Sequence, residues 1–561
     1  MRFIRRRLVA ILVVASIVIF GEIALGNTIA KNQELIEPPV KITEAFKNIP
    51  YNPDSSQEKN ISRNPDPSIS DEPKAINDFA WKDFIALNWP VDCQGKPLYS
   101  TDPLSGQKYP KIIGQAPEAP RRWELYPSPK DVFGLNAETP PSLDKLPEVD
   151  RCLNDRAGSE IQYNQNLRLT EAEELVTEKE SSEYKIASIV GLLDGNGELK
   201  SELNINGNPV KISLSSIDAA NKIPLVDRQG NYVINEIRLN PVEFKQIVEK
   251  KWFDASNLLD LKNSYDGKKL FQLVCSSGST LTKEDSDKYC DTYKDEGAIE
   301  IKAVWRVFDE RNTEEEKARY YRTERKIVSE KGEILEEQAE LGLIGFHIMH
   351  KTSSRGWIWS TFEHIDNAPP CDVQKTKQYT LYNNECNTKN CKENEPYVKP
   401  PYLWDISNKE PKAVTIEVSE GTAVKDQVSS QICRANPISN LATKQNKEWQ
   451  KSLIAIAESS VWQYYQLIGT QWLLHPEIPY SNQADGKDLR RRQITPNSQP
   501  LTNVALEPYA QGVSCIVCHT SARLWKTGDF CELNKDPRNC ADFSFLMDNA
   551  KSSKQITINQ N

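Results

Sequence analysis

The chain has 561 residues and a formal net charge of −9 at pH 7. Its length fits two to four typical domains, or one large body with insertions. The acidic balance argues against nucleic acid and anionic lipid surfaces as partners, because both are bound by clustered Lys and Arg. The 34 prolines against 24 glycines, with a low mean hydropathy, predict many ordered loops around the core.

The first 26 residues have the pattern of a secretory signal peptide. Arg2 and Arg5–Arg7 form a basic region, an apolar run extends from Leu8 to Phe20, and Ala24–Gly26 offers small residues for cleavage. The apolar run is shorter than the roughly 20 residues that span a bilayer comfortably. We therefore expect export to the periplasm or the thylakoid lumen. The alternative is an uncleaved segment, which would then attach the chain to a membrane.

Polar and charged residues with little apolar periodicity predict a mostly disordered leader at 27–76. The body, residues 77–500, is expected to be mixed α and β, and its first helix is predicted from Ala75 to Trp89. Further patterns in chain order predict a strand at 231–239, a helix at 241–253, a strand at 298–307, a Cys-tethered irregular excursion at 371–440, a helix at 449–469 and a polar loop at 481–500.

The densest group of histidines lies in a predicted β-hairpin. Alternating and apolar runs at 343–350 and 357–364 flank a polar turn. Strand alternation places His347 and Met349 on one face and His350 on the other. By the same alternation, the charges beside the apolar strands are expected on the solvent face, although they could instead build a polar pocket: Glu300, Arg306, Arg322, Glu363 and Asp366.

Near the C-terminus, Cys515, Cys518 and His519 form a Cys-x-x-Cys-His motif. This spacing is typical of a c-type haem site, in which each thiol forms a thioether and the histidine becomes the proximal iron ligand. A thioredoxin-like dithiol would favour a βαβ context, whereas the residues at 508–512 are loop-like. A zinc site would need a second, closely spaced ligand pair. We therefore expect residues 501–561 to bind one covalent haem c.

The other ten cysteines are an even number in a chain expected to be exported, which favours disulfides. Neighbours in sequence are plausible partners, namely Cys275–Cys290, Cys386–Cys391 and Cys531–Cys540. The remaining four cysteines cannot be paired from sequence, and free buried thiols are the alternative.

The sixth iron ligand decides between electron transfer and chemistry at the iron. His347 and His350 are the candidates for a distal ligand or a distal acid–base residue. Met547 follows the motif, but a methionine in an apolar helix more often fills the core. His475 has the surroundings of an exposed loop residue. Arg490–Arg492 could neutralise haem propionates, although a solvated loop is the default expectation for them.

Several segments together resemble a family of large exported bacterial proteins called cytochrome c family proteins. The segments that carry the resemblance are 83–90, 300–306, 345–352, 357–363, 366–367, the haem motif and 542–546. The resemblance spans about residues 77 to 550 and implies a single-haem exported protein, without an established reaction. Family members carry Gln at the position of His364 and Leu at that of Met547, which disfavours both as ligands.

Together the patterns predict an α+β fold, with a large mixed body, antiparallel hairpins and a C-terminal haem-binding segment. The expected function is electron transfer with a redox partner protein. One alternative is a haem enzyme, peroxidase-like or acting on a small substrate, with a distal histidine. The other is a haem-based redox sensor or binding protein.

Overall fold

The computed structural model describes residues 71–145, 225–274, 296–384, 431–473 and 500–553 with short gaps, and short segments at 186–209 and 392–424. The chain divides into two compact units. In the first, residues 1–48 and 99–109, the described residues form β1 (Tyr99–Thr101), which pairs with β2 (Lys108–Pro110). No helix among the described residues is both long and apolar enough to cross a membrane. The predicted signal peptide, residues 1–26, lies outside the described residues.

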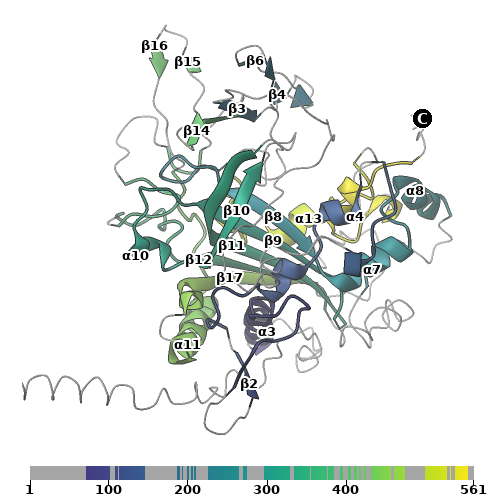
Figure 1. The fold of residues 1–561 in the computed structure, drawn as a ribbon, viewed down its shortest axis with the longest axis horizontal. Helices are drawn as coiled ribbons and strands as arrows, with labels where there is room; N and C mark the ends of the chain where they lie inside the picture. The colour runs from purple at the N-terminus through teal and green to yellow at the C-terminus, as the bar shows by residue number, and fades with distance from the viewer. Residues whose placement is uncertain are drawn as a thin grey trace, which may run out of the picture. The chain divides into compact units, whose positions relative to one another are not determined.

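The second unit is built around a six-stranded antiparallel sheet (Figure 1). Its strand order is β17-β12-β11-β9-β8, and β10 also pairs with β11. The strands are β8 (Ile234–Leu239), β9 (Ile299–Val307), β10 (Arg322–Val328), β11 (Ile334–Thr352), β12 (Gly356–His364) and β17 (Tyr465–Trp472). The mixed α+β class is confirmed, as are the predicted strands at 231–239 and 298–307 and the hairpin of β11 and β12.

One face of this sheet is covered by two long helices, α3 (Asp71–Leu87) and α11 (Asn440–Ile456). The Phe84 ring of α3 lies 4.2 Å from the ring of Phe362 and 5.7 Å from that of Phe346. These aromatic contacts bury the apolar side of α3 against the hairpin. The helix begins at Asp71, so its first turn falls within the predicted 27–76 leader.

The opposite face packs against helices and the C-terminal segment, through a large buried cluster that includes Met349, Trp357 and Trp359 of the sheet. The elements on this side are α4 (Pro129–Val132), α7 (Pro241–Glu249), α8 (Ala255–Asn263), α13 (Cys515–His519) and the 3₁₀ helix η8 (Phe545–Asn549). The predicted helix at 241–253 is thus confirmed in α7.

Covering both faces corrects the expectation that strand charges lie in solvent. Glu300, Arg306 and Glu363 are buried, whereas Arg322 is exposed and Asp366 is half-buried. Strand alternation identifies two faces, but it does not tell whether one of them is wet. The buried charges are held by polar partners: Arg306 donates to Glu316 at 2.7 Å, and Arg434 forms an ion pair with Glu363.

The predicted helix at 449–469 is wrong in its second half. The helix α11 ends at Ile456, a 3₁₀ turn follows at Val461–Tyr464, and the chain then enters β17. Short apolar runs do not distinguish a buried strand from a helix. Here pairing along the free edge of β12 decides the outcome, since Ile358 lies opposite Trp472 and Thr361 opposite Gly469.

The excursion at 371–440 contains short strands and is tethered by a disulfide between Cys371 and Cys433. The predicted Cys531–Cys540 disulfide is confirmed, while the pairs Cys275–Cys290 and Cys386–Cys391 lie outside the described residues, as do His475 and Arg490–Arg492. The short strands of the excursion are β13 (Tyr402–Asp405), β14 (Glu410–Lys412), β15 (Ile416–Val418) and β16 (Thr422–Val424). Five more short strands lie outside it, at residues 186–209: β3 (Ile186–Ile189), β4 (Leu192–Leu193), β5 (Leu199–Lys200), β6 (Asn204–Ile205) and β7 (Asn208–Pro209).

We expect Asn240→Ala to lower the free energy of unfolding by about 2 kcal/mol, because Asn240 is the N-cap of α7. Its side chain accepts from the backbone N–H of Glu243 at 3.1 Å and donates to the carbonyl of Gly297 at 2.8 Å. Denaturant unfolding followed by circular dichroism measures the change. An Asn240→Ala variant that unfolds at the wild-type denaturant midpoint would show that the cap contributes little to stability.

Candidate haem-binding site

The Cys-x-x-Cys-His motif forms the single helical turn α13, which follows Ser514 in extended conformation. Cys515 is buried and Cys518 is exposed, and both are free thiols. The other described cysteines are disulfide-bonded: Cys93, Cys371, Cys433, Cys531 and Cys540. Residues three apart on a helix lie on one side of it, so the two free thiols face the same region.

The surroundings of the motif raise the pKa of both thiols. Burial raises the pKa of Cys515 well above its usual value, and the charge of Glu507 raises it further. The same two causes raise the pKa of Cys518. Disulfide oxidoreductases depend on the opposite shift, because the thiolate is the attacking species. The environment therefore disfavours the thioredoxin-like alternative.

His519 is held in one orientation by the chain that follows the motif. Its Nδ1 lies 2.7 Å from the carbonyl oxygen of Phe543, so Nδ1–H donates to that carbonyl and Nε2 is left as the nitrogen that can bind a metal. Burial lowers the pKa of His519 to about 4. The imidazole is therefore neutral at physiological pH, as an iron ligand must be.

The carbonyl that orients His519 sits on an unusual piece of backbone. Asp542 and Phe543 have φ angles of 50° and 70°, a left-handed conformation that costs a residue with a side chain about 1–3 kcal/mol. Two contacts hold it: Trp357 Nε1 donates to the Asp542 carbonyl at 2.7 Å, and Lys351 forms a buried ion pair with the Asp542 carboxylate. We refer to residues 541–544 as the proximal loop.

Aromatic side chains surround His519. The ring of Trp359 lies 6.0 Å and that of Phe545 5.1 Å from the imidazole. Phe545 and Val517 are among the few large apolar side chains that the described residues leave exposed, at 39% and 44%. Exposed apolar groups next to a histidine whose Nε2 is available fit a site that an apolar cofactor would cover.

His347 lies on the same face of the sheet as His519. It is opposite Thr361 and Lys302 in the neighbouring strands, two positions from Met349 in the buried cluster. Burial lowers the pKa of His347 to about 3, and the charges of His519 and Lys302 lower it further, so the two imidazoles are within electrostatic reach. The Nε2 of His347 is buried and has no hydrogen-bond partner among the described residues.

The other histidines of the hairpin lie elsewhere. His350 points to the opposite face, where its Nδ1 lies 2.7 Å from a carboxylate oxygen of Asp83 in α3. His364 stacks on Tyr320 at 3.9 Å, and its Nε2 lies 3.1 Å from the carbonyl of Arg319. Met547 is fully buried in the apolar cluster. The fold thus brings His347, and not His350, to the motif.

Two charged residues near the motif were missed by sequence reasoning. Lys302 lowers the pKa of both His347 and His519, and it also lowers that of Glu507. Burial raises the pKa of Glu507 to about 7, although the backbone N–H of Asn503 donates to this carboxylate at 2.9 Å. Only tertiary packing brings Lys302 and Glu507 together, since about 200 residues separate them.

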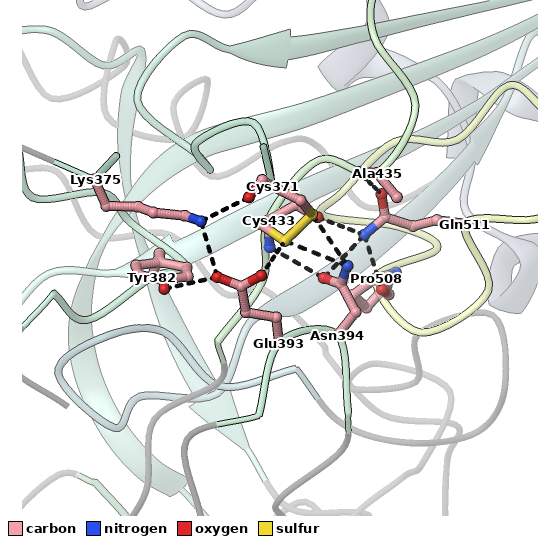
Figure 2. Close-up of a disulfide and its surroundings, with 9 residues drawn as sticks. All are labelled: Cys371, Lys375, Tyr382, Glu393, Asn394, Cys433, Ala435, Pro508 and Gln511. Atoms are coloured by element: carbon pink, nitrogen blue, oxygen red, sulfur yellow. Dashed lines mark hydrogen bonds and ion pairs between the residues drawn. A yellow bond between two sulfur atoms is a disulfide. The ribbon is translucent and has the colours of Figure 1, made fainter. Parts of the chain in front are cut away.

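The chain that enters the motif is anchored to the disulfide-tethered excursion, as Figure 2 shows. The Gln511 side chain donates to the carbonyl of Cys433 at 2.8 Å and accepts from the backbone N–H of Ala435 at 2.9 Å. A carboxylate oxygen of Glu393 lies near the sulfurs of Cys371 and Cys433. Because these sulfurs are bonded to each other, the group serves as an anchor and not as a metal site.

Comparisons of the chain with protein families, with curated proteins and with solved structures find no match. The residues of the site supply two protonated thiols on one helical turn, an oriented neutral imidazole, and a second neutral imidazole whose buried nitrogen has no hydrogen-bond partner among the described residues.

Proposed function

We propose that the chain is an exported c-type cytochrome that holds one haem and transfers electrons. The observation that carries this proposal is that the motif combines two free thiols with an oriented imidazole. Cys515 and Cys518 are free thiols one helical turn apart, and the His519 imidazole donates through Nδ1 so that Nε2 is available. Thioether attachment needs the two thiols, and axial ligation of the iron needs the available imidazole nitrogen.

The residues present fit a haem. Cys515 and Cys518 would hold it through thioethers, and His519 would be the proximal ligand. When bound, the haem supplies one-electron redox chemistry. Lys302 offers a positive charge for a propionate, and Trp359 and Phe545 offer apolar surface beside the imidazole.

We propose His347 as the second axial ligand. Its side chain is 8% exposed, neutral at physiological pH, and buries a nitrogen without a hydrogen-bond partner among the described residues. A buried polar atom without a partner costs free energy, and this cost is offset if the atom binds a metal. Ligation by two histidines favours electron transfer over substrate chemistry at the iron.

Export to the periplasm or thylakoid lumen, with a redox partner protein there, belongs to the same proposal. It rests on the signal-peptide pattern at residues 1–26 and is supported by the disulfides Cys371–Cys433 and Cys531–Cys540, since such bonds persist in oxidising compartments. A cleaved signal peptide would be seen as an N-terminus near residue 27 in the mature protein.

The test is the optical and EPR spectrum of the purified protein, oxidised and reduced, with and without CO. We expect a six-coordinate, low-spin wild type that does not bind CO. In His347→Ala the sixth position opens, so we expect a high-spin ferric spectrum and CO binding when reduced. The matched control is His350→Asn, which keeps a donor for Asp83 on the opposite face and should leave the low-spin spectrum unchanged.

Two results would contradict this assignment. A wild type that is five-coordinate and binds CO would show that His347 is not an iron ligand and would favour the enzyme alternative. A low-spin spectrum that survives His347→Ala would remove His347 from the iron altogether. Turnover of peroxide with an electron donor, lost in His347→Ala, would establish the enzyme.

A further inference from the structure

Two glutamates are buried on the haem side of the sheet, one on a helix and one on a strand. Glu243 lies in the first turn of α7 and is fully buried, and Glu300 lies on β9 and is 8% exposed. Neither forms an ion pair with Lys or Arg among the described residues. Carboxyl groups so placed normally have a paired cation or several donors.

The oxygens of the two carboxyls point to a bound proton. Both oxygens of Glu243 and Oε1 of Glu300 are buried, and no donor among the described residues reaches them. The two glutamates nevertheless lie close together, because Asn240 Oδ1 accepts from the backbone N–H groups of both Glu243 and Ile299, the neighbour of Glu300. Ser544 bonds to Glu300. Two carboxyls buried this close together, without a paired cation among the described residues, cannot both stay ionised, so one of them holds a proton.

Few charged groups lie near this carboxyl pair, and they belong to β11, to β9 and to the proximal loop. Burial is the largest cause that raises both pKa values, that of Glu243 far above its usual range and that of Glu300 to about 7. Asp542 of the proximal loop raises both further, and Lys351 of β11 lowers that of Glu243. Lys302, two positions along β9 from Glu300, is the next cation on this face.

The carboxyl pair is connected to His519 through short links. Ser544, the partner of Glu300, directly follows Phe543, whose carbonyl accepts from His519. In the sheet, Glu300 lies opposite Met349, and Met349 lies opposite Trp359, whose ring is beside the imidazole. A change of charge at the iron would therefore shift the pKa values of the Glu243 and Glu300 carboxyls, because the buried surroundings screen charge only weakly.

We infer that Glu243 and Glu300 form a proton-binding site that takes up one proton when the haem iron gains one electron. This inference rests on the proposed function. In the oxidised protein the pair shares one proton and carries one negative charge, which the ferric site stabilises. An electron from the redox partner removes one positive charge, and one proton from solvent then binds Glu300, so the net charge of the region is conserved.

The reduction potential of the purified holoprotein, measured against pH, tests the inference. One proton per electron lowers the potential by about 59 mV for each tenfold fall in proton concentration. We expect a slope approaching this value around neutral pH in the wild type and a slope near zero in Glu300→Gln. In Glu243→Gln the pH range over which the potential changes should move to lower pH, because an amide donor then stabilises the Glu300 carboxylate.

A second readout follows the proton itself. In infrared difference spectra, reduction of the wild type should increase a protonated-carboxyl band that Glu300→Gln lacks. The matched control is Glu448→Gln, which removes an exposed carboxylate from α11 on the opposite face and should leave slope and band unchanged.

The outcomes separate this inference from the function on which it rests. A chain without covalent haem overturns the proposed function and this inference with it. A haem protein whose potential is constant between about pH 5 and about pH 9 overturns this inference alone, and so does a slope that persists in both Gln variants.

Discussion

Replacing Cys515 and Cys518 together with alanine is expected to abolish covalent haem binding, the largest change that any substitution in this chain should produce. Both thioether bonds are lost, and the neutral His519 alone holds an iron porphyrin only weakly. The measurement is the mass of the protein after denaturation, together with haem staining after electrophoresis in SDS. Wild type should carry the mass of one haem, and the double variant that of its amino acids.

The matched control removes two cysteines that are bonded to each other, Cys371 and Cys433. Cys371→Ala with Cys433→Ala should still stain for haem, because neither sulfur faces the motif. The proposal fails if a wild type produced with a haem-attachment system carries no covalent haem. It also fails if the Cys515 and Cys518 double variant keeps the added mass.

Lys351→Met is expected to lower the free energy of unfolding by about 3–5 kcal/mol, the largest stability effect near the site. The ammonium group is 4% exposed, donates to the carbonyl of Leu273 at 2.6 Å and pairs with Asp542. Its removal takes the cation away from the buried Asp542 carboxylate of the proximal loop, to which the backbone N–H of Leu273 still donates at 2.9 Å. Unfolding in denaturant measures the loss, and the haem spectrum should broaden as His519 loses its fixed orientation.

A second substitution distinguishes charge from packing. Lys351→Met combined with Asp542→Asn should recover a good part of the stability, because no unpaired charge then remains buried. The exposed Lys444→Met on α11 should change stability by less than about 0.5 kcal/mol. If Lys351→Met were as mild as Lys444→Met, the ion pair would not be what holds the proximal loop.

Much of the sheet could be predicted because its strands carry local signals. The alternating runs of β8 and β9 and the hairpin of β11 and β12 were recognised from period and turn residues alone. The strand β17 was missed, since only the open edge of β12 makes it a strand. The short strands of the excursion carry too few residues for a period to be read.

The residue types of the site could be predicted from sequence, but the residues packed around them could not. The motif identifies Cys515, Cys518 and His519 by spacing, and alternation separates His347 from His350. Which face the motif covers depends on packing of residues 501–553 against the sheet, about 150 residues after the hairpin. The same packing buries Glu243 with Glu300, which no local pattern indicates.

Two disulfide-bonded and two free cysteines lie close together in the sequence, between residues 515 and 540. Cys531 and Cys540 are joined, whereas Cys515 and Cys518 stay reduced. Thiolates exchange far faster than thiols, so the raised pKa of Cys515 and Cys518 slows their scrambling with the neighbouring bond. In the oxidising compartment that we propose for this chain, a closed Cys531–Cys540 bond would remove the two nearest competing sulfurs and leave Cys515 and Cys518 free to attach a haem.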